Sequence, residues 1–206
     1  LIRTTRGCPW NRCEFCVNYR DMKFSMRSLA EVKRDITAAA EFYRERRFTS
    51  CFLQDGDSFL MKTGELVELL TFLKEAFPWL ERISSYGRAQ TMARKSDQEM
   101  RAICQAGLTK LYCGMESGSD RVLTKVNKGV TAAEISTAGR RAKVAGMSVS
   151  EFVILGLGGR ESWEEHARET AKVLNEIDPH FVRVLTIGVK PGSGLLLLLG
   201  DLGTGK

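Results

Sequence analysis

Near its start the chain contains the stretch Arg6-Gly7-Cys8-Pro9-Trp10-Asn11-Arg12-Cys13-Glu14-Phe15-Cys16, which has three cysteines in one short loop. A cluster of four irons needs four ligands, so the three thiolates of Cys8, Cys13 and Cys16 can hold three irons and leave one iron open. An open iron is a position at which a small molecule can bind and react. The spacing therefore predicts an iron–sulfur site with one vacant coordination position.

Two alternative roles for these cysteines stay open. One is a zinc site completed by a distant ligand, and the second is three thiols that merely share a loop. Zinc would need a fourth cysteine or histidine, but the only histidines, His166 and His180, lie far along the chain. A disulfide would leave one thiol over and is typical of small secreted proteins. The pattern therefore favours the cluster.

Length and composition indicate a globular chain. A chain of 206 residues can bury a substantial core, and 43% hydrophobic with 27% charged residues does not indicate disorder. The net charge of +6 weakly favours an acidic partner such as nucleic acid, a phosphorylated cofactor or an acidic carrier protein. Arg44, Arg46 and Arg47 fall at a predicted helix end, where cations interact favourably with the helix dipole. Part of the charge therefore belongs to a solvated helix terminus.

The cellular location is expected to be cytoplasmic. The longest run of strongly apolar residues, Leu195 to Leu199, has five members, which is too short to cross a bilayer. No signal peptide precedes the first predicted strand. In a reducing compartment the six cysteines would serve as thiolates or as buried apolar groups. Because the chain starts at Leu1 without a methionine, we also expect a trimmed piece whose flanking domains are missing.

Strand and helix patterns alternate from end to end, which predicts an α/β protein with a parallel sheet. Periodicity alone leaves open whether that sheet curls into a barrel or is open and doubly wound. We expect six strands separated by five helices. The predicted strands are Leu1 to Thr5, Ser50 to Gln54, Arg82 to Tyr86, Lys110 to Met115, Ser150 to Gly156 and Phe181 to Ile187.

Helix boundaries are signalled by side chains that bond to the backbone. A hydroxyl followed three residues later by glutamate predicts a capping box, in which each side chain satisfies an amide of the first turn. Glycines at 107 and 146 are expected to end two helices, because a left-handed residue is common there. The four predicted boxes begin at Ser28, Ser96, Thr131 and Ser162.

The cysteine loop resembles the signature of the radical S-adenosylmethionine (radical SAM) superfamily, including the aromatic Phe15 before the last cysteine. One departure is the four residues from Pro9 to Arg12 between the first two cysteines, where the commonest spacing has three. The resemblance implies a partial (β/α)6 barrel with parallel strands and the site at their carboxyl ends. We expect residues 1–190 to form this core domain and residues 191–206 to form a tail that is truncated or tag-like.

The turn after the second predicted strand resembles the family's Gly-Gly-Glu motif. It reads Asp55-Gly56-Asp57, and the resemblance implies that its backbone and acid hold the methionine amino group of S-adenosylmethionine. The acid is one methylene shorter and the first glycine is missing. Considered alone, the stretch also fits an ordinary polar turn.

The fourth predicted strand ends at a second candidate site. Alternation places Tyr112, Gly114 and Glu116 on one face and Cys113 on the other. If Glu116 points into the barrel, Cys113 points at the helices, so we interpret it, with Cys51 and Cys104, as a small buried apolar residue. By resemblance Glu116 holds the ribose hydroxyls, since a carboxylate accepts two hydrogen bonds. Ser117, which follows it, belongs to the same predicted cofactor site.

Three further residues complete the predicted cofactor site. Lys128 matches a position where similar proteins bind the methionine carboxylate, although a solvated loop lysine fits equally well. Arg88 is the other candidate cation for that carboxylate or for substrate. Leu155 lies in a stretch that resembles the one packing on adenine, and this stretch lacks the dinucleotide fingerprint.

The tail Gly200 to Lys206 resembles a phosphate-binding loop cut before its hydroxyl residue and its helix. Without them it could not place magnesium, so a truncated or misassigned end is the favoured interpretation.

The resemblance implies an enzyme core with a 4Fe–4S cluster and S-adenosylmethionine as cofactors, a reduced donor such as flavodoxin or ferredoxin, and an unspecified substrate. A non-catalytic electron-transfer module is a second hypothesis, but it would want a fourth local cysteine. An RNA-binding module would want aromatic residues interleaved with a basic face, and none is evident. A nucleotide-binding α/β protein would need residues beyond Lys206.

Overall fold

The computed structural model describes residues 1–195 of the chain. The stretch 200–206, with its predicted phosphate-binding loop, and most of the predicted tail lie outside these residues. Within residues 1–195 no helix is both long and apolar enough to span a membrane.

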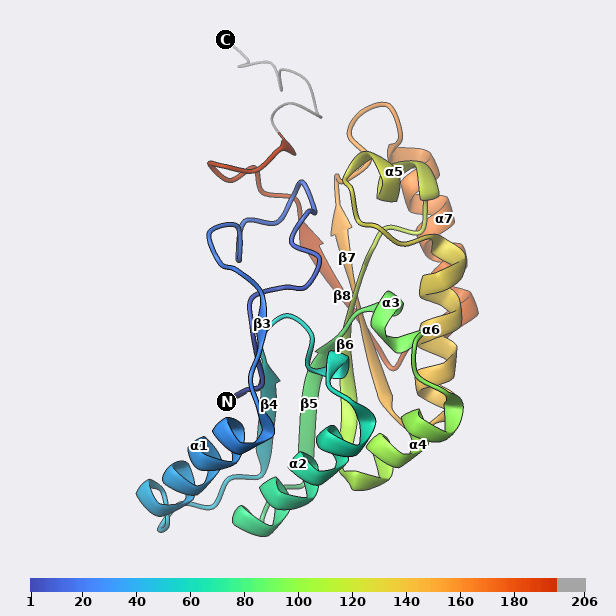
Figure 1. Cartoon of the computed structure of the whole chain (residues 1–206). Coiled ribbons are helices and arrows are strands. Elements are labelled where there is room, and N and C mark those ends of the chain that lie inside the picture. Colours follow the sequence, from blue (N-terminus) through green and yellow to red (C-terminus); the bar gives the residue numbers. More distant parts are fainter. Residues whose placement is uncertain (196–206) are drawn as a thin grey trace.

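Six parallel strands form one sheet in the order β1-β4-β5-β6-β7-β8, as the sequence predicts. The strands β1 and β8 are the two edges and do not pair, so the sheet is a partial barrel and not a closed one. Each connection leads from the carboxyl end of one strand back to the amino end of the next, so the carboxyl ends of all six strands lie along one rim of the sheet (Figure 1). The strands are β1 (Ile2–Arg3), β4 (Ser50–Gln54), β5 (Arg82–Gly87), β6 (Leu108–Glu116), β7 (Ser148–Leu155) and β8 (Phe181–Thr186).

The prediction for the first strand, Leu1 to Thr5, is wrong about its length. Strand β1 ends at Arg3, and the chain then forms a separate antiparallel pair, β2 (Thr5–Arg6) with β3 (Ser25–Met26). Thr4 separates the two, because its amide and its hydroxyl both donate to the carbonyl of Gln54 and its hydroxyl also bonds Ser58. The small β2–β3 ladder closes the base of the cysteine loop.

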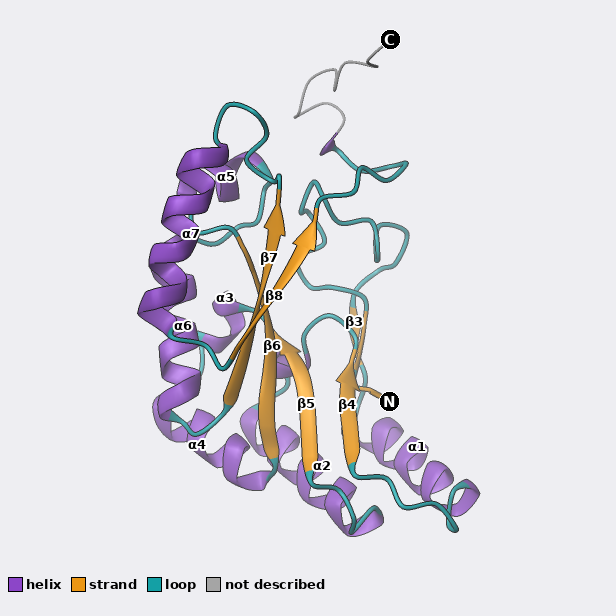
Figure 2. Cartoon of the chain, turned by 180° about the vertical axis from the view of Figure 1, so that it is seen from behind, coloured by secondary structure: helices purple, strands orange, loops and turns teal. Residues whose placement is uncertain are grey.

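The five predicted crossover helices are present, and two short helices and one 3-10 turn are added at the rim. The helices of residues 1–195 all lie on one side of the sheet, and in the view from behind none of them lies in front of the other face (Figure 2). The elements are α1 (Leu29–Phe42), η1 (Ser58–Leu60), α2 (Thr63–Ala76), α3 (Ala89–Met92), α4 (Asp97–Ala106), α5 (Asp120–Lys125), α6 (Ala132–Val144) and α7 (Trp163–Ile177).

The hydrophobic core lies between the sheet and these helices. Alternate strand residues such as Leu53, Leu111 and Val149 are fully buried in it. Cys113 belongs to the same core, with its sulfur 4.0 Å from that of Met92. Cys51 and Cys104 are partly buried against it, as expected for small apolar residues.

Three of the four predicted capping boxes form, at Ser28, Ser96 and Thr131. The fourth prediction is wrong: Ser162 precedes α7 without a side-chain cap. Its intended partner, Glu165, accepts a hydrogen bond from Ser119 and pairs with Arg121 instead. Gly107 ends α4 with φ +126°, and Gly146 follows α6 with φ +93°, so both predicted helix-ending glycines are confirmed.

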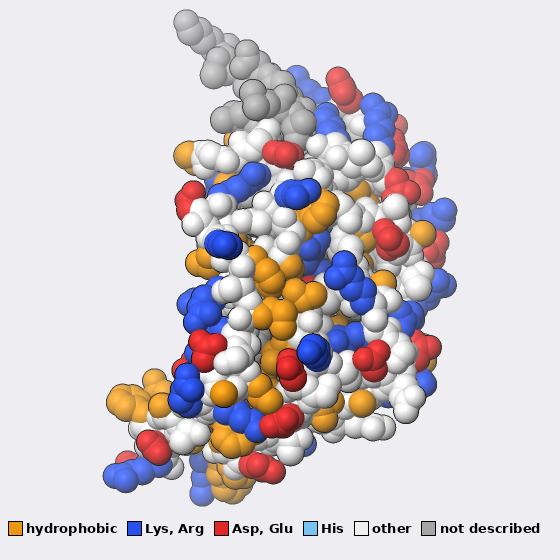
Figure 3. Space-filling model, in the orientation of Figure 1, with side chains coloured by type: hydrophobic (Ala, Val, Ile, Leu, Met, Phe, Trp, Pro, Cys, Tyr) orange, Lys and Arg blue, Asp and Glu red, His pale blue; other side chains and the backbone are white. Residues whose placement is uncertain are grey.

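On the helix-bearing side, positive and negative side chains are interspersed and do not form a basic stripe (Figure 3). Ion pairs such as Lys33–Glu68 and Arg141–Asp97 join neighbouring elements there. This side of the molecule therefore offers no continuous phosphate-binding surface.

Candidate functional site

The cysteine loop runs from β2 to β3 above the rim formed by the carboxyl ends of the strands (Figure 1). Cys8, Cys13 and Cys16 are partly buried free thiols. Arg20 fixes the loop, because its guanidinium donates to the carbonyls of Cys16 at 3.0 Å and Cys13 at 2.9 Å. Asn11 adds a bond from its amide nitrogen to the carbonyl of Tyr19 at 2.6 Å. Sequence reasoning missed Arg20, whose only signal is its distance of four residues from Cys16.

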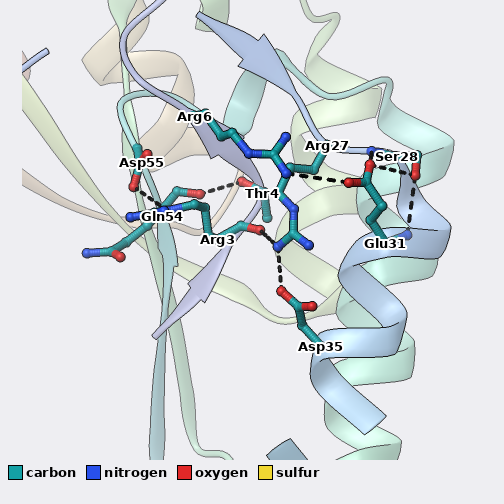
Figure 4. A network of polar contacts seen from close by, with 9 residues as sticks. All are labelled: Arg3, Thr4, Arg6, Arg27, Ser28, Glu31, Asp35, Gln54 and Asp55. Atoms are coloured by element: carbon teal, nitrogen blue, oxygen red, sulfur yellow. Dashed lines mark hydrogen bonds and ion pairs between the residues drawn. The ribbon is translucent and has the colours of Figure 1, made fainter. Parts of the chain in front are cut away.

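Asp55 and Gly56 hold the start of the loop. One carboxylate oxygen of Asp55 accepts from the Arg3 guanidinium at 3.2 Å (Figure 4), and the other accepts from the amide of Gly7 at 3.1 Å. The amide of Gly56 donates to the Gly7 carbonyl at 3.1 Å. A Cβ on Gly56 would lie 2.8 Å from that carbonyl oxygen and 2.9 Å from the Cα of Cys8. Glycine is therefore required where the two segments touch.

The network around this base continues to the start of α1 (Figure 4). Arg6 pairs with Glu31 at 3.4 Å, and Glu31 also accepts from Ser28 in its capping box. Arg27 donates to the carbonyl of Arg3 and pairs with Asp35. Helix α1 thus anchors both strands that frame the cysteine loop.

Asp57 lies apart from Asp55, in the interior against α3. The hydroxyl of Thr91 donates to its Oδ2 at 2.5 Å, while its Oδ1 has no partner among residues 1–195. Burial raises the pKa of Asp57 to about 6, against the lowering effects of Thr91 and of the Arg88 charge. The tripeptide predicted as one motif therefore separates into a loop anchor and a buried acid with a free oxygen.

Glu116 and Lys128 form a buried ion pair at the end of β6. The Lys128 ammonium donates to Glu116 Oε1 at 2.9 Å. A Cβ on Gly114 would lie 2.3 Å from that oxygen and 3.0 Å from the ammonium nitrogen, so only glycine leaves room for the pair. Burial alone would lower the pKa of Lys128, but the charges of Glu116 and Cys13 outweigh it and raise the pKa. The pair therefore lies beside the cysteine loop, and Lys128 keeps its positive charge.

Cys13 is a loop cysteine close enough to this pair for their charges to interact. Burial raises the pKa of its thiol, and the positive charges of Lys128 and Arg88 act in the opposite direction. The Lys128 ammonium also lies 5.8 Å from the ring of Phe15, and the Arg88 guanidinium lies 5.6 Å from the ring of Trp10. The structure thus brings together the predicted residues Cys13, Phe15, Arg88, Glu116 and Lys128.

The segment after α5 fastens to the cysteine loop through its backbone. Trp10 Nε1 donates to the carbonyl of Asn127 at 2.7 Å, and the amide of Glu14 donates to that of Val126 at 2.9 Å. Gln90 donates to the carbonyl of Gly129. These bonds fix Lys128 relative to the cysteines.

Helix α7 holds the turn that follows Glu116. Ser117 Oγ bonds His166 Nδ1 at 2.8 Å, and His166 Nε2 bonds the carbonyl of Ile154 at 3.0 Å. A carbonyl only accepts, so Nε2 carries the hydrogen and Nδ1 accepts from the serine. Thr170 accepts from the amide of Gly118 at 2.9 Å. Ser117 is completely buried and engaged in these bonds, and sequence reasoning missed His166, which has no motif around it.

Leu155, at the end of β7, is 49% exposed and stays outside this buried group. Its neighbour Ile154 packs instead in a small cluster with Val122, Val126 and Leu157, against which Phe15 also packs. Leu155 is therefore an exposed apolar residue at the rim.

The chemistry of the loop fits an iron–sulfur cluster. Within residues 1–195, no three His, Cys, Asp or Glu side chains converge as a ready site for a single metal ion. A four-iron cluster is larger than one ion, so its cysteines bind different irons and need not converge on a point. Three free thiols on one anchored loop, with charged groups beside Cys13, suit such a cluster with an adjoining polar ligand.

Comparisons with known proteins agree with this geometry. A sequence profile described as Radical SAM superfamily matches residues 2–174. An uncharacterized methyltransferase of Pyrococcus horikoshii is 25% identical over 197 residues, which cover 95% of this chain and 40% of that protein. The crystal structure of methylornithine synthase (PylB) matches with a TM-score of 0.69 at 21% identity, covering 94% of this chain and 54% of that one.

A second solved structure is the radical S-adenosylmethionine methyltransferase TsrM from Kitasatospora setae, with cobalamin and a 4Fe–4S cluster bound. It matches with a TM-score of 0.71 at 18% identity, covering 94% of this chain and 38% of that one. At these identities the two structures establish the fold. The chain thus spans between 38% and 54% of the length of these three proteins.

Proposed function

The chain belongs to the radical SAM superfamily, and from this premise we propose that it is an enzyme core in which Cys8, Cys13 and Cys16 hold a 4Fe–4S cluster. When bound and reduced, the cluster supplies the electron that splits S-adenosylmethionine into methionine and a 5′-deoxyadenosyl radical, which takes hydrogen from a substrate. The donor of that electron is a reduced protein such as flavodoxin or ferredoxin. A reducing cytoplasmic compartment suits the free thiols.

The observation that carries this proposal is the buried Glu116–Lys128 pair beside Cys13. The Lys128 ammonium has three donors and gives one to Glu116, so the others remain for the methionine carboxylate. Glu116 Oε2 remains to accept from the ribose hydroxyls. The Lys128–Glu116 bond already orients both groups before the ligand arrives, which lowers the free-energy cost of organising the site.

The remaining predicted residues are assigned supporting roles in the proposed site. Arg88 offers a second cation next to Trp10, and Asp57 offers a buried oxygen that can accept from the methionine ammonium. Asp55 and Gly56 position the loop, while their backbone stays near Cys8. Leu155 provides an apolar surface for the adenine. Ser117 and His166 hold the turn that aims Glu116.

The cluster assignment is tested by comparing two cysteine variants of the full chain after anaerobic reconstitution with iron and sulfide. We expect Cys13→Ala to lose bound iron and to form no 5′-deoxyadenosine from S-adenosylmethionine and dithionite. Cys104→Ala, on the helix-covered side, should keep both iron and product. Equal behaviour of the two variants would show that the ligand set is wrong. If the protein bound iron and S-adenosylmethionine but formed no 5′-deoxyadenosine, the alternative hypothesis of a non-catalytic module would be favoured.

The cosubstrate assignment is tested with Glu116→Gln. Removing the charge should weaken S-adenosylmethionine binding about tenfold, which is about 1.4 kcal/mol, with unchanged iron content. The matched control is Glu164→Gln, an exposed glutamate of α7. Equilibrium dialysis of the reconstituted protein measures both. Equal affinities in the two variants would remove Glu116 from the site.

A second candidate outcome is methyl transfer, because the curated relative from Pyrococcus horikoshii carries the name methyltransferase. In that reaction S-adenosylhomocysteine would form together with a methylated product. Chromatography of the same reaction mixtures separates S-adenosylhomocysteine from 5′-deoxyadenosine. The ratio of the two therefore distinguishes methyl transfer from radical cleavage.

A further inference from the structure

The open face of the sheet carries a continuous band of aromatic side chains. Phe52 lies 4.9 Å from Tyr86 and 5.7 Å from Tyr112, measured between ring centroids, and Tyr112 lies 6.2 Å from Phe152. These residues come from β4, β5, β6 and β7 and alternate with the aliphatic residues that face the helices. None of the helices that the structure describes lies over this face in the view from behind (Figure 2).

Two cations lie on this aromatic band. The Lys110 ammonium is 3.8 Å from the ring centroid of Phe181 and 5.2 Å from that of Tyr112. The Arg183 guanidinium is 5.1 Å from the ring of Tyr112. Neither cation has a carboxylate within ion-pair distance in the part of the chain that the structure describes.

The strands supply no negative charge to this face. Across β4 to β8 the acidic residues are Glu116 and Glu151. Glu116 is paired with Lys128, and Glu151 lies in register with Cys113, which packs on the helix side. The aromatic band therefore carries two positive charges that nothing on the strands neutralises.

The band adjoins the site proposed above. Phe152 lies in register with Gly114, the residue over which the Glu116–Lys128 pair lies. Tyr19 of the cysteine loop is close enough to Tyr86, Cys8 and Cys16 for all three to influence its pKa, which burial raises. A molecule on the band would therefore lie between the cysteine loop and the floor of the sheet.

We propose that this open face selects a planar aromatic molecule carrying a negative charge, which is the substrate class of the site proposed above. Aromatic side chains stack on planar rings, and each ring already holds its orientation through an edge or tilted contact with its neighbour. Lys110 and Arg183 attract the anionic group across the same surface. That the bound molecule is the substrate rests on the proposed function; that an aromatic anion binds here does not.

Charge complementarity distinguishes this occupant from a further segment of the protein. An apolar chain segment laid over the face would bury two cations without partners, which costs free energy. An aromatic anion supplies both the partner charge and the ring surface. Phe181 and Tyr86, which are 50% and 39% exposed, leave the band accessible to it.

The test uses three small probes on the reconstituted full chain without S-adenosylmethionine or reductant. Indole-3-acetate carries both features, indole-3-acetamide lacks the charge, and hexanoate lacks the ring. Calorimetric titration should show indole-3-acetate binding at least tenfold more tightly than either of the others. The double variant Lys110→Met with Arg183→Met should remove the preference for the acid over the amide. The matched double variant Lys62→Met with Arg101→Met, of exposed cations at the helices, should keep it.

The inference would be overturned if indole-3-acetamide or hexanoate bound as tightly as indole-3-acetate. It would also be overturned if the control double variant lost the preference for indole-3-acetate over indole-3-acetamide. Phe152→Leu, which keeps an apolar side chain, provides a second arm and should weaken both indole probes about equally. Because binding is measured without the radical reaction, failure to form 5′-deoxyadenosine would leave this result unaffected. Binding with no such product would therefore contradict only the proposed function.

Discussion

The two faces of the six-stranded sheet carry opposite kinds of side chain. The helix-covered face presents Leu53, Leu111 and Val149, all fully buried in one aliphatic core. The open face presents Phe52, Tyr112 and other rings with Lys110 and Arg183 among them. Neighbouring residues of the same strand thus serve different purposes: one side stabilises the fold, and the other is available for binding.

The cysteines show the same division. Cys113, on the helix-covered face, is buried, and burial raises its pKa well above the usual value, so it stays a thiol. Cys8, Cys13 and Cys16 lie at the rim on a loop anchored by Arg20 and Asp55, and the charges of Lys128 and Arg88 act on Cys13. Residue type alone does not set the chemistry of a cysteine; its surroundings do.

The largest expected change in stability comes from comparing substitutions at two adjacent residues of β6. Leu111→Ala should lower the free energy of unfolding by about 3 kcal/mol, because it leaves a cavity in a close-packed core. Tyr112→Leu, on the open face, should cost about 1 kcal/mol, because the ring is only partly buried and the apolar volume is largely kept. Urea denaturation measures both. Equal losses would show that the open face contributes to the core as much as the covered one.

A smaller effect concerns Glu151, an acid on the covered side. Burial raises its pKa to about 8, with the Glu116 charge adding to this and the Lys128 charge opposing it, and its Oε2 has no hydrogen-bond partner among residues 1–195. Between pH 4.5 and 8 the folded protein holds a proton that the unfolded chain releases, so stability falls as pH rises through this window. Glu151→Gln should remove this decline and raise stability at pH 8 by roughly 1 to 2 kcal/mol.

The measurement for Glu151 is urea denaturation at pH 5 and pH 8. The matched control is Glu75→Gln, an exposed glutamate of α2, which should keep the decline of the unaltered chain. An unchanged pH dependence in Glu151→Gln would mean that Glu151 is charged in the folded state.

The smallest effect compares the starts of two helices. Ser96→Ala removes a formed capping box from α4 and should cost about 1 kcal/mol. Ser162→Ala removes no cap bond from α7, since Glu165 serves the turn at Ser119, and should cost less than about 0.5 kcal/mol. Thermal denaturation would detect the difference. A larger loss at Ser162 would indicate that its buried side chain has a packing role.

Much of the fold could be predicted from local sequence. Period-two and helical patterns placed six strands and five crossover helices, and capping boxes located three helix starts. The errors fall where distant residues decide: Thr4 bonds Gln54 and ends β1 early, and Ser119 takes the glutamate that would have capped α7. Local rules cannot anticipate a partner that only folding supplies.

The sequence by itself determined that three cysteines share one short loop, because their spacing is covalent, and that neighbouring residues of a strand point to opposite faces of the sheet. Only the tertiary structure decided that Asp55 bonds to the cysteine loop while Asp57 bonds to Thr91 in the interior, and that Lys128 pairs with Glu116. It also brought His166 to Ser117 across 49 residues of sequence. The physical reason is that hydrogen bonds and charges act through space, and packing of the sheet against its helices sets which groups meet.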